Sequence, residues 1–218
     1  PTDNRIIEIG AVKVEGMEVV DRFSMLIHPG CPIPPFITEL TGITDQDVKD
    51  APSIDVVMPL FAEFAKGYHL LGHNIAFDYS FLKENASKLG IPFDFYGVDT
   101  MRLAGRFIAE PISKSLTNLV NHFGLQRESA HRAYDDAYAT HQLYALFYER
   151  FYETDQSVFM PVKLSYKVRK SSGITSSQKK YLKDLLTKHE QTLDKDIDTL
   201  TKSEASQEID RLIRTFGR

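Results

Sequence analysis

The chain has 218 residues, of which 42% are hydrophobic and 26% charged, and its formal net charge is −4. This composition is that of a globular protein and excludes wholesale disorder. The sequence has no apolar run of the roughly 18–20 residues that cross a bilayer, so we expect no integral membrane protein. A single cysteine, Cys31, excludes an internal disulfide framework and a cysteine-ligated zinc site, and it favours a reducing cytoplasm.

Two strands are predicted first, at residues 5–14 and 19–27, separated by the hairpin signal Glu15-Gly16. A loop at 29–35, a helix at 53–66 and a short buried strand at 68–72 follow. The apolar spacing then predicts three further helices, over residues 77–89, 115–123 and 133–151. Strands followed by helices in this order indicate an α/β domain.

The last fifty or so residues have a different pattern. Thr175-x-x-Gln178 and Thr201-x-x-Glu204 are capping boxes, and each opens a helix with an apolar stripe. We therefore expect a domain over residues 1–160, a basic linker over 161–174 and a small helical module over 175–218.

Charge is divided unevenly along the chain. From Lys163 onward there are 13 Lys and Arg against 8 Asp and Glu, a net charge of +5, whereas the preceding residues carry 13 against 22, a net charge of −9. Residues 163 to 183 contain seven basic residues and no acid. This stretch is either a solvated linker or a contact for nucleic-acid phosphates, which basic segments bind through counterion release.

Three clusters bear the residue types of a catalytic site: residues 73–82, 99–103 and 131–137. The first places Asp78 where a strand passes into a helix, a usual place for ligand binding. Each cluster has an ordinary structural explanation when taken alone. An acid in the first turn of a helix is favoured by the helix dipole, and a histidine before a helix is commonly a cap.

Taken together and in this order, the clusters resemble the DnaQ-like 3′–5′ exonucleases of the DEDDh family, close to the proofreading exonucleases of bacterial replicative polymerases. The resemblance extends over roughly residues 1 to 151. The segments that carry it are Arg5-Ile6-Ile7-Glu8-Ile9-Gly10-Ala11-Val12, Leu40-Thr41-Gly42-Ile43-Thr44, Asn74-x-x-Phe77-Asp78 and His131-x-Ala133-x-x-Asp136. It implies a ribonuclease H-like fold, with a mixed five-stranded sheet flanked by helices.

The resemblance also implies roles for individual residues. Asp78 and Asp136 would be catalytic, metal-binding carboxylates, and His131 the general base. The expected cofactor is Mg²⁺ or Mn²⁺, as two ions about 3.5–4 Å apart, because such pairs serve the attacking and leaving oxygens of a phosphodiester. Hard cations take oxygen ligands, and a histidine with a pKa near 6.5 accepts a proton at neutral pH.

Four residues are expected at the substrate. Asn74 and Phe77 would shape the second motif around the metal site, while Leu40 and Thr41 would line the pocket of the 3′-terminal nucleotide. The implied reaction is hydrolysis of single-stranded nucleic acid, DNA in preference to RNA, to nucleoside 5′-monophosphates. The implied setting is proofreading or repair, with a polymerase or repair partner. The alternative is a catalytically degenerate module that binds nucleic acid or acts as a scaffold.

The family's first motif, Asp-x-Glu on the first strand, is not found in the sequence. Three explanations stand: an incomplete N-terminus, a degenerate relative, or a strand supplied by a partner chain. In the family this strand lies at the centre of the sheet, and its loss would orphan the backbone hydrogen bonds of both neighbours. Because that loss exceeds ordinary domain stability of about 5–15 kcal/mol, and because the first residue is Pro1, we expect the chain to begin inside a longer protein.

Overall fold

The protein forms two compact units in the computed structural model, which describes residues 4–127, 131–168, 173–193 and 195–217. One unit comprises residues 5–167, and the other includes residues 168–218. The division therefore falls inside the segment expected as a linker. The first residues of that segment are part of the α/β unit, because Val162–Lys163 form a strand and Leu164 is buried in its core.

Two sheets make up the strand layer of the α/β unit. Strands β1 (Glu8–Glu15) and β2 (Glu18–Leu26) form the antiparallel hairpin expected from Glu15-Gly16. Its turn has positive φ at both Gly16 (55°) and Met17 (71°), which matches the right-handed twist of the strands. The second sheet has the order β3 (Leu70–Gly72), β4 (Tyr96–Asp99) and β5 (Val162–Lys163), with β3 parallel and β5 antiparallel to β4.

The α/β class predicted from the sequence is confirmed, but the strands do not form a single sheet. The described residues contain five strands, divided into a pair and a group of three. Within these residues β1 has a ladder partner only in β2, and β3 only in β4. Each of these two strands therefore has one edge without a strand beside it, which is why one continuous mixed sheet is not formed.

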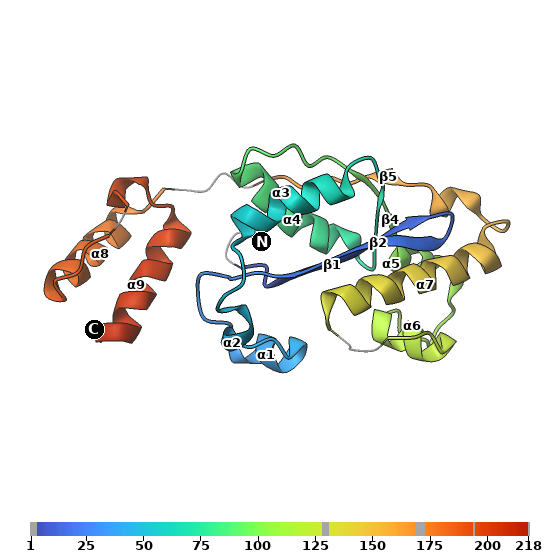
Figure 1. Ribbon diagram of the computed structural model, residues 1–218, viewed down its shortest axis with the longest axis horizontal. Coiled ribbons are helices and arrows are strands. Elements are labelled where there is room, and N and C mark those ends of the chain that lie inside the picture. The colour runs from blue at the N-terminus through green and yellow to red at the C-terminus, as the bar shows by residue number, and fades with distance from the viewer. Residues whose placement is uncertain (1–3, 128–130, 169–172, 194, 218) are drawn as a thin grey trace. The chain divides into compact units, whose positions relative to one another are not determined.

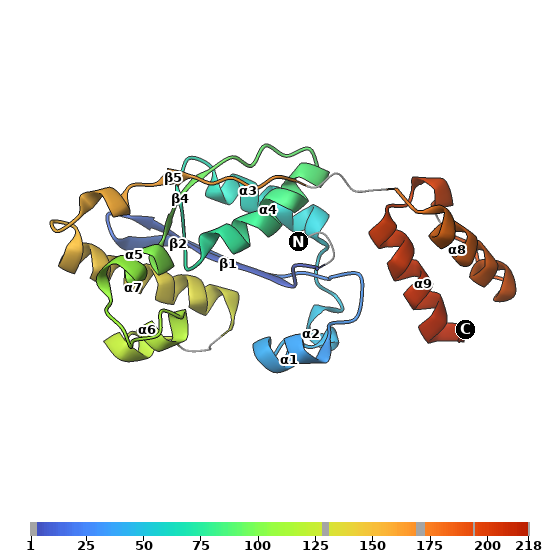
Figure 2. The same cartoon turned by 180° about the vertical axis from the view of Figure 1, so that it is seen from behind.

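Helices cover both faces of the strand layer (Figures 1 and 2). Helices α3 and α4 pack on one side, where they share a core with β1, and α7 covers the other side, with α5 and α6 packed against it. The helix bounds are α1 Pro35–Thr41, α2 Asp45–Val48, α3 Ile54–Ala65, α4 Ile75–Lys88, α5 Thr100–Phe107, α6 Leu116–Phe123 and α7 Ala133–Phe151. In the part of the chain that the structure describes, no helix is both long and apolar enough to cross a membrane.

The C-terminal unit is a pair of helices with its own core. Helices α8 (Ser176–Lys188) and α9 (Lys202–Phe216) both begin with the capping boxes read from the sequence. Their shared core is formed by Leu182, Leu185, Leu200, Ala205 and Leu212. Because these side chains are buried against one another, the unit has the apolar interior of a small folded module.

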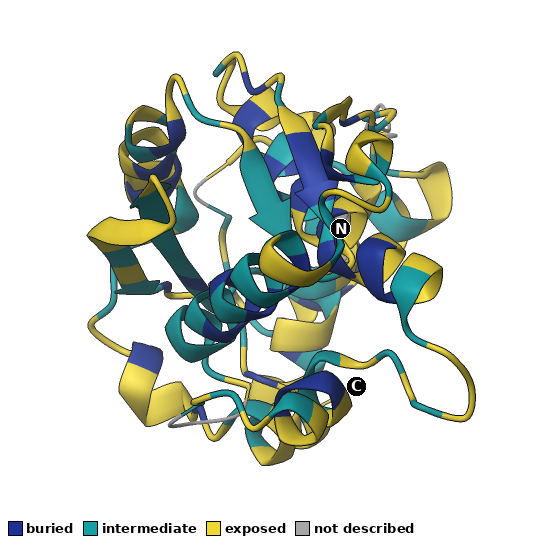
Figure 3. Ribbon diagram, turned by 90° about the vertical axis from the view of Figure 1, so that its right-hand side faces the viewer, coloured by how far each residue is buried: buried dark blue, intermediate teal, exposed yellow. Residues whose placement is uncertain are grey.

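Helix α7 approaches β1 closely at Gly10. A β-carbon built on Gly10 would lie 2.2 Å from the backbone nitrogen of Tyr134 and 2.3 Å from the carbonyl carbon of Ala133. Any larger residue would therefore meet backbone rather than a movable side chain. Figure 3 shows the ribbon coloured by how far each residue is buried.

We predict that Gly10→Ala displaces the start of α7 and lowers the free energy of unfolding by about 1–3 kcal/mol, the range for overpacking a core. The control is Gly105→Ala on α5, where a β-carbon would meet nothing within 4 Å. Gly105→Ala should leave the free energy of unfolding unchanged or raise it, since alanine is a better helix former than glycine. Urea unfolding of both variants checks the prediction, and equal stability of the two would contradict it.

Candidate active site

Asp78 lies in the first turn of α4, just after the end of β3. The chain turns between the two elements at Asn74, whose φ and ψ of 68° and 47° are left-handed. The Asn74 amide donates a hydrogen bond to Asp99 Oδ1 over 2.9 Å. This contact holds the turn that brings Asp78 to the carboxyl end of β3, where parallel strands present ligands.

Asp99 belongs to one of the three clusters named from the sequence, but the sequence assigned it no role of its own. It ends β4 and caps α5, because its Oδ1 accepts a hydrogen bond from the Met101 amide at 2.9 Å. The same oxygen accepts the Asn74 bond, so one carboxylate joins the ends of β3 and β4 to the starts of two helices. The sequence signal was an acid between a strand and a helix, which is too common to stand out alone.

The electrostatic surroundings of Asp78 are unfavourable to its charge. Burial of the carboxyl among protein atoms raises its pKa from 3.8 to about 6, and repulsion from Asp136 and Asp99 acts in the same direction. The residue as a whole is nevertheless exposed to solvent, so the effect on stability is much smaller than for a buried group. The structure therefore brings together Asp78 and Asp136, the two carboxylates predicted as metal ligands, with Asp99 close by.

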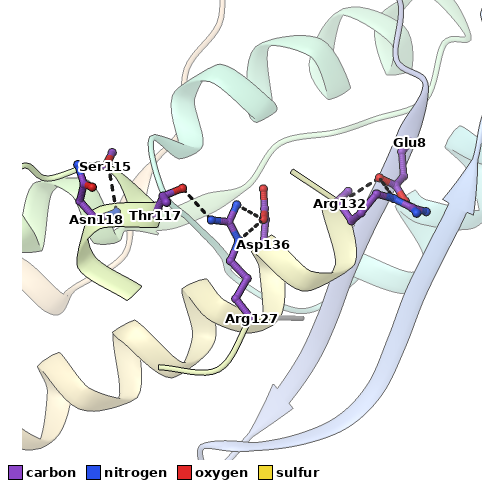
Figure 4. A network of polar contacts seen from close by, with 8 residues as sticks. Glu8, Ser115, Thr117, Asn118, Arg127, Arg132 and Asp136 are labelled. Carbon is purple, nitrogen blue, oxygen red and sulfur yellow. Dashed lines mark hydrogen bonds and ion pairs between the residues drawn. The ribbon is translucent and has the colours of Figure 1, made fainter. Parts of the chain in front are cut away.

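Asp136 lies one turn into α7 and is held by an arginine (Figure 4). Its Oδ1 accepts hydrogen bonds from Arg127 Nε at 2.8 Å and Nη2 at 2.5 Å, and Arg127 Nη1 donates to Thr117 Oγ1 at 2.8 Å. This network ties the loop before α7 to the start of α6. Nothing in the sequence pattern linked Arg127 to the site.

His131 is exposed and precedes α7 with a left-handed φ of 65°. Its neighbour Arg132 is fixed by Glu8 on β1, which accepts hydrogen bonds from Arg132 Nε and Nη2 and, at 2.8 Å, from the Ala133 amide (Figure 4). Glu8 thus caps α7 from a distant strand. The location of Glu8 outside the predicted metal ligands agrees with this role.

The residues predicted at the substrate lie on two helices. Phe77 on α4 is largely exposed, and its ring lies 5.1 Å from that of Phe81. Leu40 on α1 is also exposed, whereas the Thr41 hydroxyl is occupied by a hydrogen bond to the Ile37 carbonyl at 2.8 Å. The substrate roles of these residues and of Asn74 stay predictions.

His73, at the edge of the site, is held at both ring nitrogens. Burial lowers its pKa, so the ring is neutral at pH 7. Its Nε2 lies 2.8 Å from the Lys114 carbonyl, and its Nδ1 lies 2.9 Å from the Thr100 hydroxyl, which also contacts the Gly72 carbonyl at 3.2 Å. His73 is a structural residue that joins β3, α5 and the segment before α6.

The carboxylate oxygens of Asp78 and Asp136 are suitable ligands for a hard divalent cation, but two residues do not make a complete site. Two mutually repelling carboxylates favour a positive ion between them, and oxygen donors are those that Mg²⁺ and Mn²⁺ take. Asp136 Oδ2 accepts no hydrogen bond from the described residues, so it has a lone pair to offer. Over the ranges that the structure describes, however, no group of three or more His, Cys, Asp or Glu side chains could hold a metal.

Comparisons with known proteins show the family and the fold of the chain. Residues 1–144 match the family model RNase_T, described as "Exonuclease". Over 151 residues the chain is 41% identical to a "DNA polymerase III PolC-type" of Caldanaerobacter subterraneus subsp. tengcongensis, a match that covers 69% of this chain and 11% of the polymerase. A "putative bifunctional exonuclease/endonuclease protein" of Mycobacterium tuberculosis is 45% identical over 138 residues, which cover 62% of this chain and 21% of that protein.

Solved structures give the same result for the fold. Exonuclease X, in complex with 5′ overhanging duplex DNA, is 27% identical with a TM-score of 0.55, and the match covers 68% of this chain and 86% of that one. The resemblance read from the motifs is thus confirmed by sequence and by structure. The chain spans about a tenth of the length of the PolC-type relatives.

The raised pKa of Asp78 leads to a prediction about stability without metal. The native state binds the proton of Asp78 more tightly than the unfolded chain does, so stability falls as pH rises from about 4 to 6 and stays lower above that. We expect Asp78→Asn to raise the free energy of unfolding at pH 8 by under about 1 kcal/mol, a small value because solvent screens the carboxyl. Near pH 4 the two proteins should be equally stable.

Thermal unfolding in EDTA at both pH values measures this difference. Asp94→Asn is the matched control, because a hydrogen bond from Lys83 lowers the pKa of Asp94 and its removal should destabilise at pH 8. A lower melting temperature for Asp78→Asn than for the wild type at pH 8 would show that the favourable helix dipole outweighs burial and repulsion.

Proposed function

Because the chain belongs to the RNase_T exonuclease family, we propose that it is a metal-dependent 3′–5′ exonuclease that releases nucleoside 5′-monophosphates from single-stranded DNA. The supporting observation is the convergence of Asp78 and Asp136 from the first turns of α4 and α7, with His131 preceding α7. DNA is the preferred substrate because the matched relatives are PolC-type DNA polymerases and Exonuclease X is bound to DNA. A role in proofreading or repair beside a polymerase follows from the same relatives.

The proposed mechanism assigns a task to each residue. Asp78 and Asp136 would hold Mg²⁺ or Mn²⁺, which would supply the positive charge that stabilises the transition state at phosphorus. His131 takes the proton from the attacking water, which its exposed position before α7 permits. Phe77 and Leu40 offer apolar surface to the terminal base, and Asn74 fixes the turn that presents Asp78.

We further propose that the two other carboxylates come from a strand upstream of the given sequence, placed between β1 and β3. Each of these strands has an edge without a ladder partner in the described residues, and α7 packs against both. A strand in that position would pair with both edges and would bring its side chains to the end of the sheet where Asp78 lies. The same strand could come from a partner chain, in which case activity would depend on that partner.

A second function, nucleic-acid binding without cleavage, is favoured by one observation. Asp78 and Asp136 alone, without a third ligand in the described residues, bind a cation less firmly than a complete site.

The two functions differ in a simple assay. The full-length gene product and its Asp78→Ala variant are incubated with 5′-labelled single-stranded DNA and Mn²⁺. If only the full-length gene product shortens the DNA stepwise, the protein is an exonuclease. If both proteins bind the DNA and neither shortens it, the protein is the degenerate module.

We predict that His131→Ala lowers turnover by about 10²–10⁴-fold, the range for loss of a general base, and leaves single-strand binding nearly unchanged. Pre-steady-state cleavage and fluorescence anisotropy measure the two quantities. His69→Ala is the control, since His69 is exposed near β3 and outside the predicted site. Turnover that equals the control would remove His131 from the mechanism.

The basic segment provides a separate prediction. Lys180 and Lys183 are exposed on α8, and residues 163 to 183 contain no acid. If these lysines contact phosphates, Lys180→Gln/Lys183→Gln should reduce the slope of log affinity against log salt by about 1.4, since each single-strand contact contributes about 0.7. Lys195→Gln/Lys202→Gln, two exposed lysines later in the same unit, is the control. Equal slopes would leave α8 without a role in binding.

A further inference from the structure

The segment that carries His131 lies between two arginines, and each is paired with a carboxylate (Figure 4). Arg132, on the C-terminal side, is held by Glu8 on β1. Arg127, on the N-terminal side, is held by Asp136, a residue proposed above as a metal ligand. The second pair is unusual because a cation is already placed at a carboxylate that is expected to bind another one.

Burial distinguishes the two members of this pair. The Arg127 side chain is 6% exposed, whereas that of Asp136 is 32% exposed. A guanidinium removed from water to this extent is stable only where its donors are satisfied. Three of its nitrogens donate hydrogen bonds, Nε and Nη2 to Asp136 and Nη1 to Thr117. Arg127 is therefore a fixed element of the structure and not a mobile surface side chain.

The bonds of Arg127 are directed to one oxygen of the carboxylate. Both Nε and Nη2 donate to Asp136 Oδ1, and no described residue donates to Oδ2. Since both contacts are to the same oxygen, they fix the position of Oδ1 and leave Oδ2 without a donor among the described residues. Such an arrangement prepares one oxygen for a ligand, as partners behind metal ligands commonly do.

We propose that Arg127 is a positioning residue for Asp136, which fixes Oδ1 and presents Oδ2 to the divalent cation. This inference rests on the proposed function, because it takes Asp136 as a metal ligand. Thr117 extends the arrangement, since its hydroxyl holds the far end of the guanidinium and so connects the start of α6 with the site.

The opposing view is that Arg127 acts by its charge alone. A positive charge at Asp136 would then repel a divalent cation, and removal of Arg127 would tighten metal binding. The two views differ most for Arg127→Lys, which keeps the charge but replaces a planar fork by a flexible point charge. Under the charge view this variant binds metal like the wild type, and under the positioning view it binds metal more weakly.

The test is Mn²⁺ binding by isothermal titration calorimetry to the full-length gene product, with no nucleic acid present. We expect Arg127→Lys to raise the Mn²⁺ dissociation constant about 10–100-fold, the usual effect of losing a residue that orients a ligand. Thr117→Val is a milder change, for use if Arg127→Lys folds poorly. It should raise the Mn²⁺ dissociation constant about threefold, the effect of losing one hydrogen bond. Arg106→Lys is the matched control, because Arg106 pairs with Asp155 and its side chain is 60% exposed.

A second readout separates positioning from general damage to the fold. The Mn²⁺ concentration that gives half-maximal cleavage should rise in Arg127→Lys. Turnover at saturating Mn²⁺ should stay within about threefold of the wild type, which is the effect of losing one hydrogen bond. Circular dichroism and melting temperature establish that the variants are folded.

Each outcome decides the question. Wild-type affinity for Mn²⁺ in both Arg127→Lys and Thr117→Val would overturn the positioning role, as would tighter binding by Arg127→Met. Absence of Mn²⁺ binding by the wild-type protein would overturn the metal site of the proposed function, and the inference with it. Weakened binding in both variants with an unchanged Arg106→Lys would establish the role of Arg127.

Discussion

The contact between the start of α7 and strand β1 determines the geometry of the whole site. Gly10 lets the two backbones approach, and Glu8, two residues earlier on the same strand, accepts the Ala133 amide that begins the helix. A carboxylate at a helix N-terminus is favoured by the helix dipole and satisfies an amide that the helix itself leaves free. Asp136 lies in the first turn of α7 and His131 lies two residues before the helix begins, so the contact with β1 helps to place both.

On the opposite side of the site, a single carboxylate plays the same part that Glu8 plays for α7. Asp99 binds the amides of Asn74 and Met101, and it thereby fixes the turn before α4 and the start of α5. Asp78 and Asp136 are thus carried by helices whose N-termini are anchored to different strands. A rigid arrangement of this kind suits the proposed catalysis, because an error of about 1 Å in the position of a catalytic group has a large effect on rate.

The sequence predicted those features that depend on neighbouring residues. The hairpin at Glu15-Gly16 and the capping boxes at Thr175 and Thr201 require partners only two or three residues away, and all three are present in the structure. The pairs Glu8–Arg132 and Arg127–Asp136 were not found, since the first joins residues 124 apart and neither has a periodic pattern. The strand β5 was missed for another reason: two residues give no alternation of apolar and polar positions.

The charges of the unit explain why metal binding and stability are linked. Burial raises the pKa of Asp78, and repulsion from Asp136 and Asp99 adds to this effect. Arg127 offsets the charge of Asp136, whereas Asp78 forms no ion pair with the residues that the structure describes. A divalent cation between the two aspartates would relieve the remaining repulsion, so part of its binding free energy would appear as stability of the fold. If the proposed cation binds between these two aspartates, the carboxylates that hold it would lower stability in its absence, which is the usual balance between function and stability.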